Sequence, residues 1–464
     1  MRLWYFFFLI LGATPGFAIA QTTSSRDTVP MKGMAMSMSM VPDPLDVSMD
    51  RLGSGTTWIP DAVSLPARRF NAGAWNLMLH GFAFGQYNTQ SGARGSSQFG
   101  SLNWGMLMAT HELGGGRFQV RTMLSLDAAG VSSRGYPLLL QSGETFDGAS
   151  IHDRQHPHDL WMELGAMYDR EITKTLGITL YAAPSGEPAL GPVAFMHRPS
   201  AMDIPTAPIG HHWQDATHIS FGVLSAGLFT HEWRLEASVF NGREPDQQRW
   251  NFDPIRLDSY SARVSYNPTA NWSLNAGYGF LKSPESLTPD VSIHRTTSGA
   301  MFGKKLGNDG QLATTFLWGA NLRSDHPGLS HSGLVESEAV LDRSNTVFGR
   351  IEFVQKSADD LVLIGSPLNF PAPQTFNVGA VSAGYIREIL PMRAATLGLG
   401  AMGTLNLVPQ SLQTAYGSRT PVGLLVFVRL RPLASHDAGI SNMKGMNPMG
   451  GSEAPSNAPT MTRP

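Results

Sequence analysis

Apolar and polar residues alternate along most of the chain between residues 71 and 431. In the stretch 118–128 the side chains of one face are Phe118, Val120, Thr122, Leu124, Leu126 and Ala128. The opposite face is mainly polar but includes Met123. Because successive side chains of a strand point to opposite faces, this period predicts β-strands. The predicted strands are longer than the roughly five or six residues usual in soluble sheets. Long strands with one polar face are typical of an outer-membrane β-barrel.

The alternation predicts an all-β protein with about sixteen strands (fourteen to eighteen) in a closed antiparallel transmembrane barrel of the bacterial outer membrane. The predicted strands lie at 75–88, 98–112, 117–129, 157–170, 175–184, 216–230, 233–241, 257–267, 271–281, 291–304, 311–322, 332–342, 345–356, 374–387, 393–405 and 419–431. Short and long links alternate between them, as in barrels with short periplasmic turns and long external loops. A secreted soluble β-propeller or solenoid is the alternative fold, although no repeat of the required spacing is evident.

The two ends of the chain differ from the predicted barrel, residues 71–431. Residues 1–20 are typical of a signal peptide, with Arg2 before an apolar run and a small-residue cleavage site ending at Ala20. Residues 21–70 are Met-rich and 432–464 are rich in Met, Pro and Ser, so we expect both to be disordered and periplasmic. The chain has no Cys, which excludes disulfides and thiolate metal sites.

Methionines are concentrated in both end segments. They are Met31, Met34, Met36, Met38 and Met40, and then Met443, Met446 and Met449. Thioethers are soft ligands that favour Cu(I) over Zn²⁺ or Mg²⁺. We therefore predict that both segments bind Cu(I) in the periplasm, with ordinary solvated tails as the alternative. Lys32 and Lys444 lie in identical Met-Lys-Gly-Met motifs, so the two segments resemble repeats of one functional motif.

A secreted chain with an N-terminal Met-rich segment followed by an outer-membrane barrel resembles the copper-resistance protein B family. The resemblance covers the layout and the Met-rich segments, and it carries over no residue of the barrel. It implies a role in copper tolerance, with Cu(I) as the bound ion. No organic cofactor is expected.

The densest group of metal-capable side chains is the block 151–161, which reads IHDRQHPHDLW. His156 and His158 are two residues apart, so on an extended chain both imidazoles point the same way and can hold one ion. His152 and Asp159 are further candidate ligands in this block. The long link 185–215 adds Met196, His197, His211 and His212. Both links are predicted to lie on the external side, where they can meet at the barrel mouth.

Two interpretations of these histidine-rich links remain. They bind metal, or their histidines, aspartates and arginines form ion pairs that fix the loops inside the barrel. Polar lumen positions such as Arg121, Arg263 and Glu352 likewise fit either a hydrated pore or a network that closes it.

The chain carries 34 basic and 36 acidic residues, so nothing indicates a nucleic-acid partner. The favoured function is copper handling at the outer membrane, with lipid and copper ions or small solutes as partners. A porin-like channel, with the histidine-rich links as a constriction, is the first alternative. A metal-dependent surface hydrolase is the second, but the chain lacks the usual nucleophile, phosphate-loop and zinc-helix motifs, so we expect no enzyme. The sequence does not determine the oligomeric state.

Overall fold

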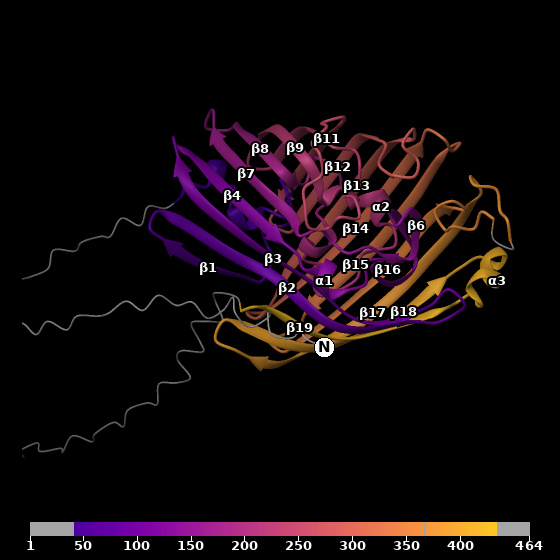
Figure 1. Cartoon of the computed structure of the whole chain (residues 1–464). Helices are drawn as coiled ribbons and strands as arrows, with labels where there is room; N and C mark the ends of the chain where they lie inside the picture. The colour runs from indigo at the N-terminus through magenta and orange to yellow at the C-terminus, as the bar shows by residue number, and fades with distance from the viewer. Residues whose placement is uncertain (1–40, 366–367, 434–464) are drawn as a thin grey trace, which may run out of the picture. The chain divides into compact units, whose positions relative to one another are not determined.

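The computed structural model describes residues 41–365 and 368–433 (Figure 1). Its main sheet has 17 strands. All of them except β1 (Ala67–Ala72) form a closed antiparallel ring of sixteen strands, in which β19 pairs with β2. The ring consists of β2 (Trp75–Gln90), β3 (Ser97–Leu113), β4 (Gly116–Leu124), β7 (Trp161–Glu171), β8 (Gly177–Gly186), β9 (Ser220–Phe229), β10 (Trp233–Phe240), β11 (Ser259–Thr269), β12 (Trp272–Lys282), β13 (Ser292–Leu306), β14 (Gly310–Arg323), β15 (Leu329–Val340), β16 (Asn345–Ser357), β17 (Thr375–Pro391), β18 (Ala395–Leu407) and β19 (Val422–Pro432).

The ring confirms the predicted barrel, and each predicted strand overlaps one strand of it. The largest difference is at the end of the strand predicted over 117–129, which stops at Leu124 and is followed by the short helix α1 (Asp127–Gly130). Two strand starts differ by four residues. The strand predicted from 157 begins at Trp161, and the one predicted from 216 begins at Ser220. In both places the preceding residues are buried and belong to the links described below. Alternation alone did not separate them from the strands.

Strand β1 completes the seam of the barrel. Residues Ala67 to Ala72 pair with the first part of β2, from His80 back to Trp75. Strand β19 pairs with the later part of β2, from Ala83 to Gln90. The two strands therefore cover successive halves of one strand, so that less backbone is left unpaired.

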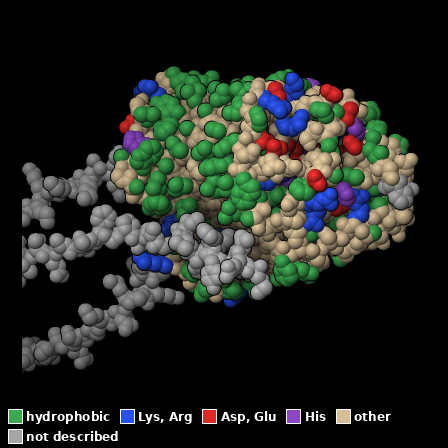
Figure 2. Space-filling model, in the orientation of Figure 1, with side chains coloured by type: hydrophobic (Ala, Val, Ile, Leu, Met, Phe, Trp, Pro, Cys, Tyr) green, Lys and Arg blue, Asp and Glu red, His purple; other side chains and the backbone are tan. Residues whose placement is uncertain are grey.

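The outer wall of the barrel is apolar. Large side chains that point outward include Leu79, Leu107, Leu180, Leu224, Leu235, Phe316, Ile351 and Leu399, each at least 41% exposed. Figure 2 shows hydrophobic side chains spread over this wall, with most of the charged side chains toward one end and a few at the other. Aromatic pairs such as Trp233 with Tyr266, 3.8 Å between ring centroids, lie beside the short turns. A closed barrel with a lipid-compatible wall is the architecture of an outer-membrane protein.

Three parts of the chain fold inward. The first is the segment 41–66, with the short helices η1 (Pro44–Asp46) and η2 (Met49–Arg51). The second is a hairpin of β5 (Tyr136–Phe146) and β6 (Ala149–Gln155), which forms its own small sheet. The third is the link 187–219, called here the lumen link, with η3 (Phe195–His197), α2 (His211–Gln214) and η4 (Ala216–His218). Almost every residue of the lumen link is buried.

The expected disorder of residues 21–70 is wrong for the described part, residues 41–70. Trp58 is 2% exposed and packs beneath Arg51 and Arg234, with the guanidinium of each within 5.6 Å of its ring. The carbonyl of Trp58 accepts a hydrogen bond from Ser273 on β12. This segment is therefore part of the lumen filling, because it carries the branched and aromatic side chains that a core requires. The folded barrel unit begins well before residue 71.

The polar lumen positions form hydrogen bonds and ion pairs with these inward segments and with one another. Arg121 donates to the carbonyl of Gly55, and Arg263 donates to Thr56 and pairs with Glu236 at 3.1 Å. Glu352 accepts a hydrogen bond from the backbone N–H of Ile209 at 2.6 Å. The lumen charges therefore bind the inward segments to the barrel wall.

The remaining helices are α1 (Asp127–Gly130), η5 (Gln410–Leu412) and α3 (Gln413–Tyr416). Among the described residues, no helix is both long and apolar enough to cross a membrane.

Candidate functional site

The lumen link is held in place by buried ion pairs with the barrel wall. Arg198 donates to Asp215 at 2.7 Å within the link and to Glu336 of β15 at 2.5 Å. Asp203 of the link pairs with Arg429 of β19. These charged groups are at most 2% exposed, and removing one partner of such a pair costs several kcal/mol, roughly 3–5. The link therefore presents its histidines in fixed positions.

Three histidines meet inside the barrel, and we call them the three-imidazole cluster: His158, His211 and His218. The ring centroids of His211 and His218 lie 5.1 Å apart, and those of His158 and His218 lie 5.5 Å apart. His158 comes from the link after β6, whereas the other two come from α2 and η4. The cluster therefore joins two segments that are far apart in the sequence.

Each imidazole of the cluster uses one nitrogen and leaves the other without a partner. Nδ1 of His158 lies 2.7 Å from Asp127, and Nδ1 of His211 lies 2.7 Å from Asp215. Nδ1 of His218 donates to the carbonyl of Asp215 at 2.8 Å. The three Nε2 atoms are buried and have no hydrogen-bond partner among the described residues. An imidazole fixed through one nitrogen by a carboxylate or carbonyl is the usual arrangement of a metal ligand.

Burial also disfavours the charged form of two of these rings, His211 and His218. It lowers the pKa of His211 and lowers that of His218 well below its usual value of 6.5. Burial opposes the ionisation of Asp215, but Arg198 and His211 outweigh it, and the pKa of Asp215 is lowered. At neutral pH His211 and His218 are therefore neutral imidazoles with free lone pairs, which is the form that binds metal.

A second group lies nearer the barrel mouth. One nitrogen of His212 and one carboxylate oxygen each of Glu244 and Glu285 lie within 4.8 Å of one another. Burial raises the pKa of both glutamates to about 7. They line a cavity of about 450 Å³ together with Glu144 and Arg243. The ring of His212 lies 5.3 Å from that of His211, so this group adjoins the three-imidazole cluster.

His156 and His158 do not share one set of partners, contrary to the sequence expectation. Nε2 of His156 lies 3.2 Å from Glu144, and its Nδ1 lies 3.3 Å from the carbonyl of Pro157. His158 faces His218 instead. The reason is that residues 156–160 are not extended strand, so spacing by two does not align their side chains. Asp159 is paired with Arg249 at 3.1 Å.

His152 lies in a different network. Its Nδ1 is 3.0 Å from Asp153, which also pairs with Arg94 at 2.6 Å and accepts from Tyr416 at 3.1 Å. The ring of His152 is 38% exposed. This network connects the β5–β6 hairpin to the links after β2 and β18. Its contacts therefore serve to hold the hairpin in place.

The remaining predicted ligands fall into two groups, one inside the barrel and one outside the described residues. Met196 and His197 are buried in η3 beside a group of methionines on the barrel wall. The methionines of the end segments, from Met31 to Met40 and from Met443 to Met449, lie outside the described residues. Their role in binding Cu(I) stays a prediction.

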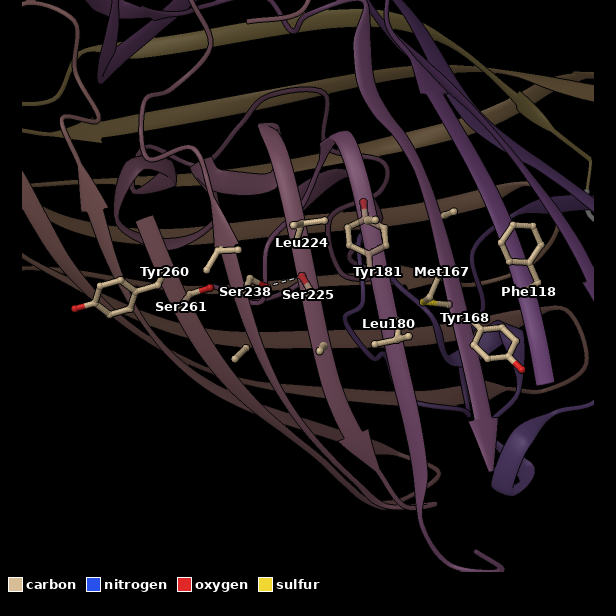
Figure 3. Close-up of a pocket in the computed structure, with 15 residues that line it drawn as sticks. Phe118, Met167, Tyr168, Leu180, Tyr181, Leu224, Ser225, Ser238, Tyr260 and Ser261 are labelled. Atoms are coloured by element: carbon tan, nitrogen blue, oxygen red, sulfur yellow. Dashed lines mark hydrogen bonds between the residues drawn. The ribbon is translucent and has the colours of Figure 1, made fainter. Parts of the chain in front are cut away.

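The outer wall has a hollow of its own, of about 650 Å³, between β4 and β11 (Figure 3). It is lined by outward side chains such as Leu180, Leu224 and Tyr260, which are 46%, 48% and 51% exposed. An apolar groove in this wall fits lipid chains, and it lies on the opposite side of the sheet from the histidines. We therefore do not assign it to the functional site.

Sequence reasoning did not assign His80, Glu244 or Glu285 to a candidate site. His80 was detectable, because it occupies an inward position of β2 in register with Met106 of β3. The two glutamates were not, since they lie in separate links after β10 and β12 and meet His212 only in the folded chain.

No family model and no curated protein matches this chain. Among solved structures, it is similar to an anion-selective porin from Comamonas acidovorans, with a TM-score of 0.47, 11% identity, and coverage of 77% of this chain and 99% of the porin. It is also similar to the Salmonella typhi OmpF complex with daunomycin, with a TM-score of 0.46, 10% identity, and coverage of 78% and 100%. For OmpT of Vibrio cholerae the values are 0.46, 7%, 79% and 100%.

Proposed function

We propose that this protein is a porin-like outer-membrane barrel whose solute is a transition-metal ion, with copper as the favoured cargo. The proposal rests on one observation, the three-imidazole cluster with its three unpartnered Nε2 atoms. Neutral imidazoles suit copper and zinc and are poor ligands for Mg²⁺ or Ca²⁺. The mouth group of His212, Glu244 and Glu285 supplies a mixed nitrogen and oxygen site between the external cavity and the cluster.

A buried nitrogen without a hydrogen bond destabilises the fold by roughly 1–3 kcal/mol. The Nε2 atoms of the three-imidazole cluster are three such atoms, and the ring centroids of His158 and His211 lie within 5.5 Å of that of His218. We infer that a bound ion is their missing partner. The carboxylates of Asp127 and Asp215 then serve to orient the rings and to balance the charge of the ion.

Metal binding by the purified, folded barrel tests this proposal. Co²⁺ reports on tetrahedral nitrogen ligation by its visible absorption and is not oxidised by the protein. We expect His211→Ala and His158→Ala each to weaken Co²⁺ binding more than about tenfold, since each removes one ligand. His111→Ala is the matched control, because His111 packs on Trp75 near a short turn. Equal Co²⁺ affinity in all four proteins would reject the proposal.

A general porin is the second candidate, and the closed ring of sixteen strands favours it. In that case the lumen link acts as a constriction. Conductance in planar bilayers separates the two functions. A steady conductance that Cu²⁺ or Zn²⁺ does not alter favours a general porin, whereas block by micromolar metal favours the metal conduit. Growth of a deletion strain on graded copper then tests the cargo.

A further inference from the structure

A cluster of methionines lies beside the three-imidazole cluster, in a lumen that outer-membrane barrels usually line with polar residues. Its members, all at most 6% exposed, are Met78, Met106, Met108, Met123, Met162 and Met196. Five of them come from four strands of the wall, and Met196 comes from η3 of the lumen link. Met123 occupies an inward position of β4 that follows Arg117, Gln119 and Arg121 in the alternation.

Two histidines accompany these sulfur atoms, and both are unusual. His80 and His197 are 3% and 2% exposed, and neither ring nitrogen of either residue has a hydrogen-bond partner within the described chain. Their ring centroids lie 5.3 Å apart, and Trp104 packs against both. Methionine is a common core filler, so the sulfur atoms alone indicate no ligand. The unpartnered imidazoles do, because a core without a ligand gains nothing from them.

A small cavity lies where these groups meet. Its volume is about 10 Å³, and its lining includes Met123, Met162, Met196, His197 and His218. This is close to the space that one water molecule or one small ion needs. Glu163 also reaches the cavity, but its carboxylate already accepts from Tyr181 at 2.8 Å and pairs with Arg121 at 3.4 Å. Glu187 lines the cavity as well; its carboxylate lies 3.7 Å from Arg263, and its two oxygens have no hydrogen-bond partner among the described residues. The free donor atoms are therefore these oxygens together with imidazole nitrogens and thioether sulfurs.

We propose that Met123, Met162, Met196 and His197 form a second site, the sulfur chamber, for one soft monovalent cation, Cu(I) or Ag(I). Thioethers select such ions and bind Zn²⁺ or Mg²⁺ poorly. His218 lines both this cavity and the three-imidazole cluster, so the two sites adjoin through one ring. The proposal deepens the proposed function and rests on it only for the passage of the ion, because the ligands of the sulfur chamber are a separate set.

The test uses the full-length protein and Ag(I), which like Cu(I) is a soft monovalent cation with a filled d shell and which has no redox chemistry under these conditions. The variant is Met123→Leu/Met162→Leu/Met196→Leu, which removes three sulfurs at nearly constant volume. The control is Met301→Leu/Met402→Leu, since Met301 and Met402 are equally buried in other parts of the lumen. Because the end segments also contain methionines, the measured quantity is the change in bound Ag(I) per chain between variants.

We expect the triple variant to bind one Ag(I) fewer than the wild type, and the control to bind the same number. Ag(I) is also expected to raise the heat-unfolding temperature of the wild type and of the control but not of the triple variant, since an ion bound outside the barrel does not stabilise it. Equal Ag(I) stoichiometry and equal stabilisation in the triple variant would overturn the sulfur chamber.

Co²⁺ separates this result from the proposed function. The triple variant is expected to keep its Co²⁺ affinity, whereas His211→Ala loses it and keeps the stabilisation by Ag(I). Intact Co²⁺ binding in His211→Ala, with the Ag(I) effect retained, would reject the three-imidazole cluster alone. A triple variant that loses both ions would show that the sulfur chamber is not a separate site.

Discussion

Arg198 is the residue whose replacement tests most directly whether the lumen link fills the barrel as a fixed element. Its guanidinium is fully buried and donates to Asp215, to Glu336 and to the carbonyl of Val193. Arg198→Met keeps most of the volume but leaves two buried carboxylates with fewer partners. Such a loss costs about 3–5 kcal/mol.

The cost is expected near the lower limit of that range. Glu336 keeps Arg350, whose Nε lies 2.8 Å away, and Asp215 keeps His211 at 2.7 Å. A cost of about 3 kcal/mol raises the population of chains with a displaced link roughly 100-fold, at about 1.4 kcal/mol per factor of ten. The barrel strands themselves are expected to remain folded, because their hydrogen bonds are unaffected.

Two measurements check this expectation. Planar-bilayer recordings of Arg198→Met are expected to show more frequent or longer openings than the wild type, and limited proteolysis is expected to cut within the lumen link. Arg343→Met is the control, since Arg343 and Asp309 form an ion pair with both side chains more than 40% exposed, and such pairs contribute about 0–1 kcal/mol. Unchanged conductance and proteolysis in Arg198→Met would refute the anchoring argument.

Three further predictions follow from single contacts. Asp127→Asn is expected to weaken Co²⁺ binding about 10–100-fold, measured by titration, because it no longer fixes the tautomer of His158. Trp58→Ala is expected to lower the free energy of unfolding of the inward segment by about 3–5 kcal/mol, seen as faster proteolysis near residue 58. Burial raises the pKa of Glu187 from 4.5 to about 8, and Arg263 opposes this shift. The folded chain therefore keeps the Glu187 proton at pH values where the unfolded chain has lost it. The free energy of unfolding accordingly falls as the pH rises from about 4.5 to 8. Glu187→Gln is therefore expected to raise the heat stability at pH 8 and to leave it unchanged at pH 4, and the opposite pH dependence would contradict the assignment.

The strands were predictable because the wall has one simple requirement. Every second residue must suit lipid and the others must suit the lumen, so alternation persists along each strand from Trp75 to Pro432. The inward segments obey no such period. Residues 41–66 contain Trp58, Ile59 and Val63 among prolines, glycines and serines, and only their contacts with β11 and β12 show that they are folded.

The site was predictable in its residue types more than in its geometry. The histidines of 151–161 and of the lumen link were recognisable as candidate ligands. The pairing of His156 with His158 was wrong because it assumed an extended backbone, whereas these residues lie in an irregular link. Met123 was visible in the sequence as an exception on a polar strand face. Only the register of β2, β3 and β4 places it in one row with Met106 and His80.

The two interpretations of the histidine-rich links, loop fixation and metal binding, are compatible in this arrangement. Each imidazole of the three-imidazole cluster uses Nδ1 to hold its link in place, through Asp127 or Asp215. In a neutral ring the same hydrogen bond places the lone pair on Nε2, which is buried and has no hydrogen-bond partner among the described residues. A loop fixed only for structural reasons has no need to leave these nitrogens unsatisfied, since the buried ion pairs of Arg198 already anchor it. The cost of three unpaired buried nitrogens is therefore the physical argument that the links position a ligand site in addition to closing the barrel.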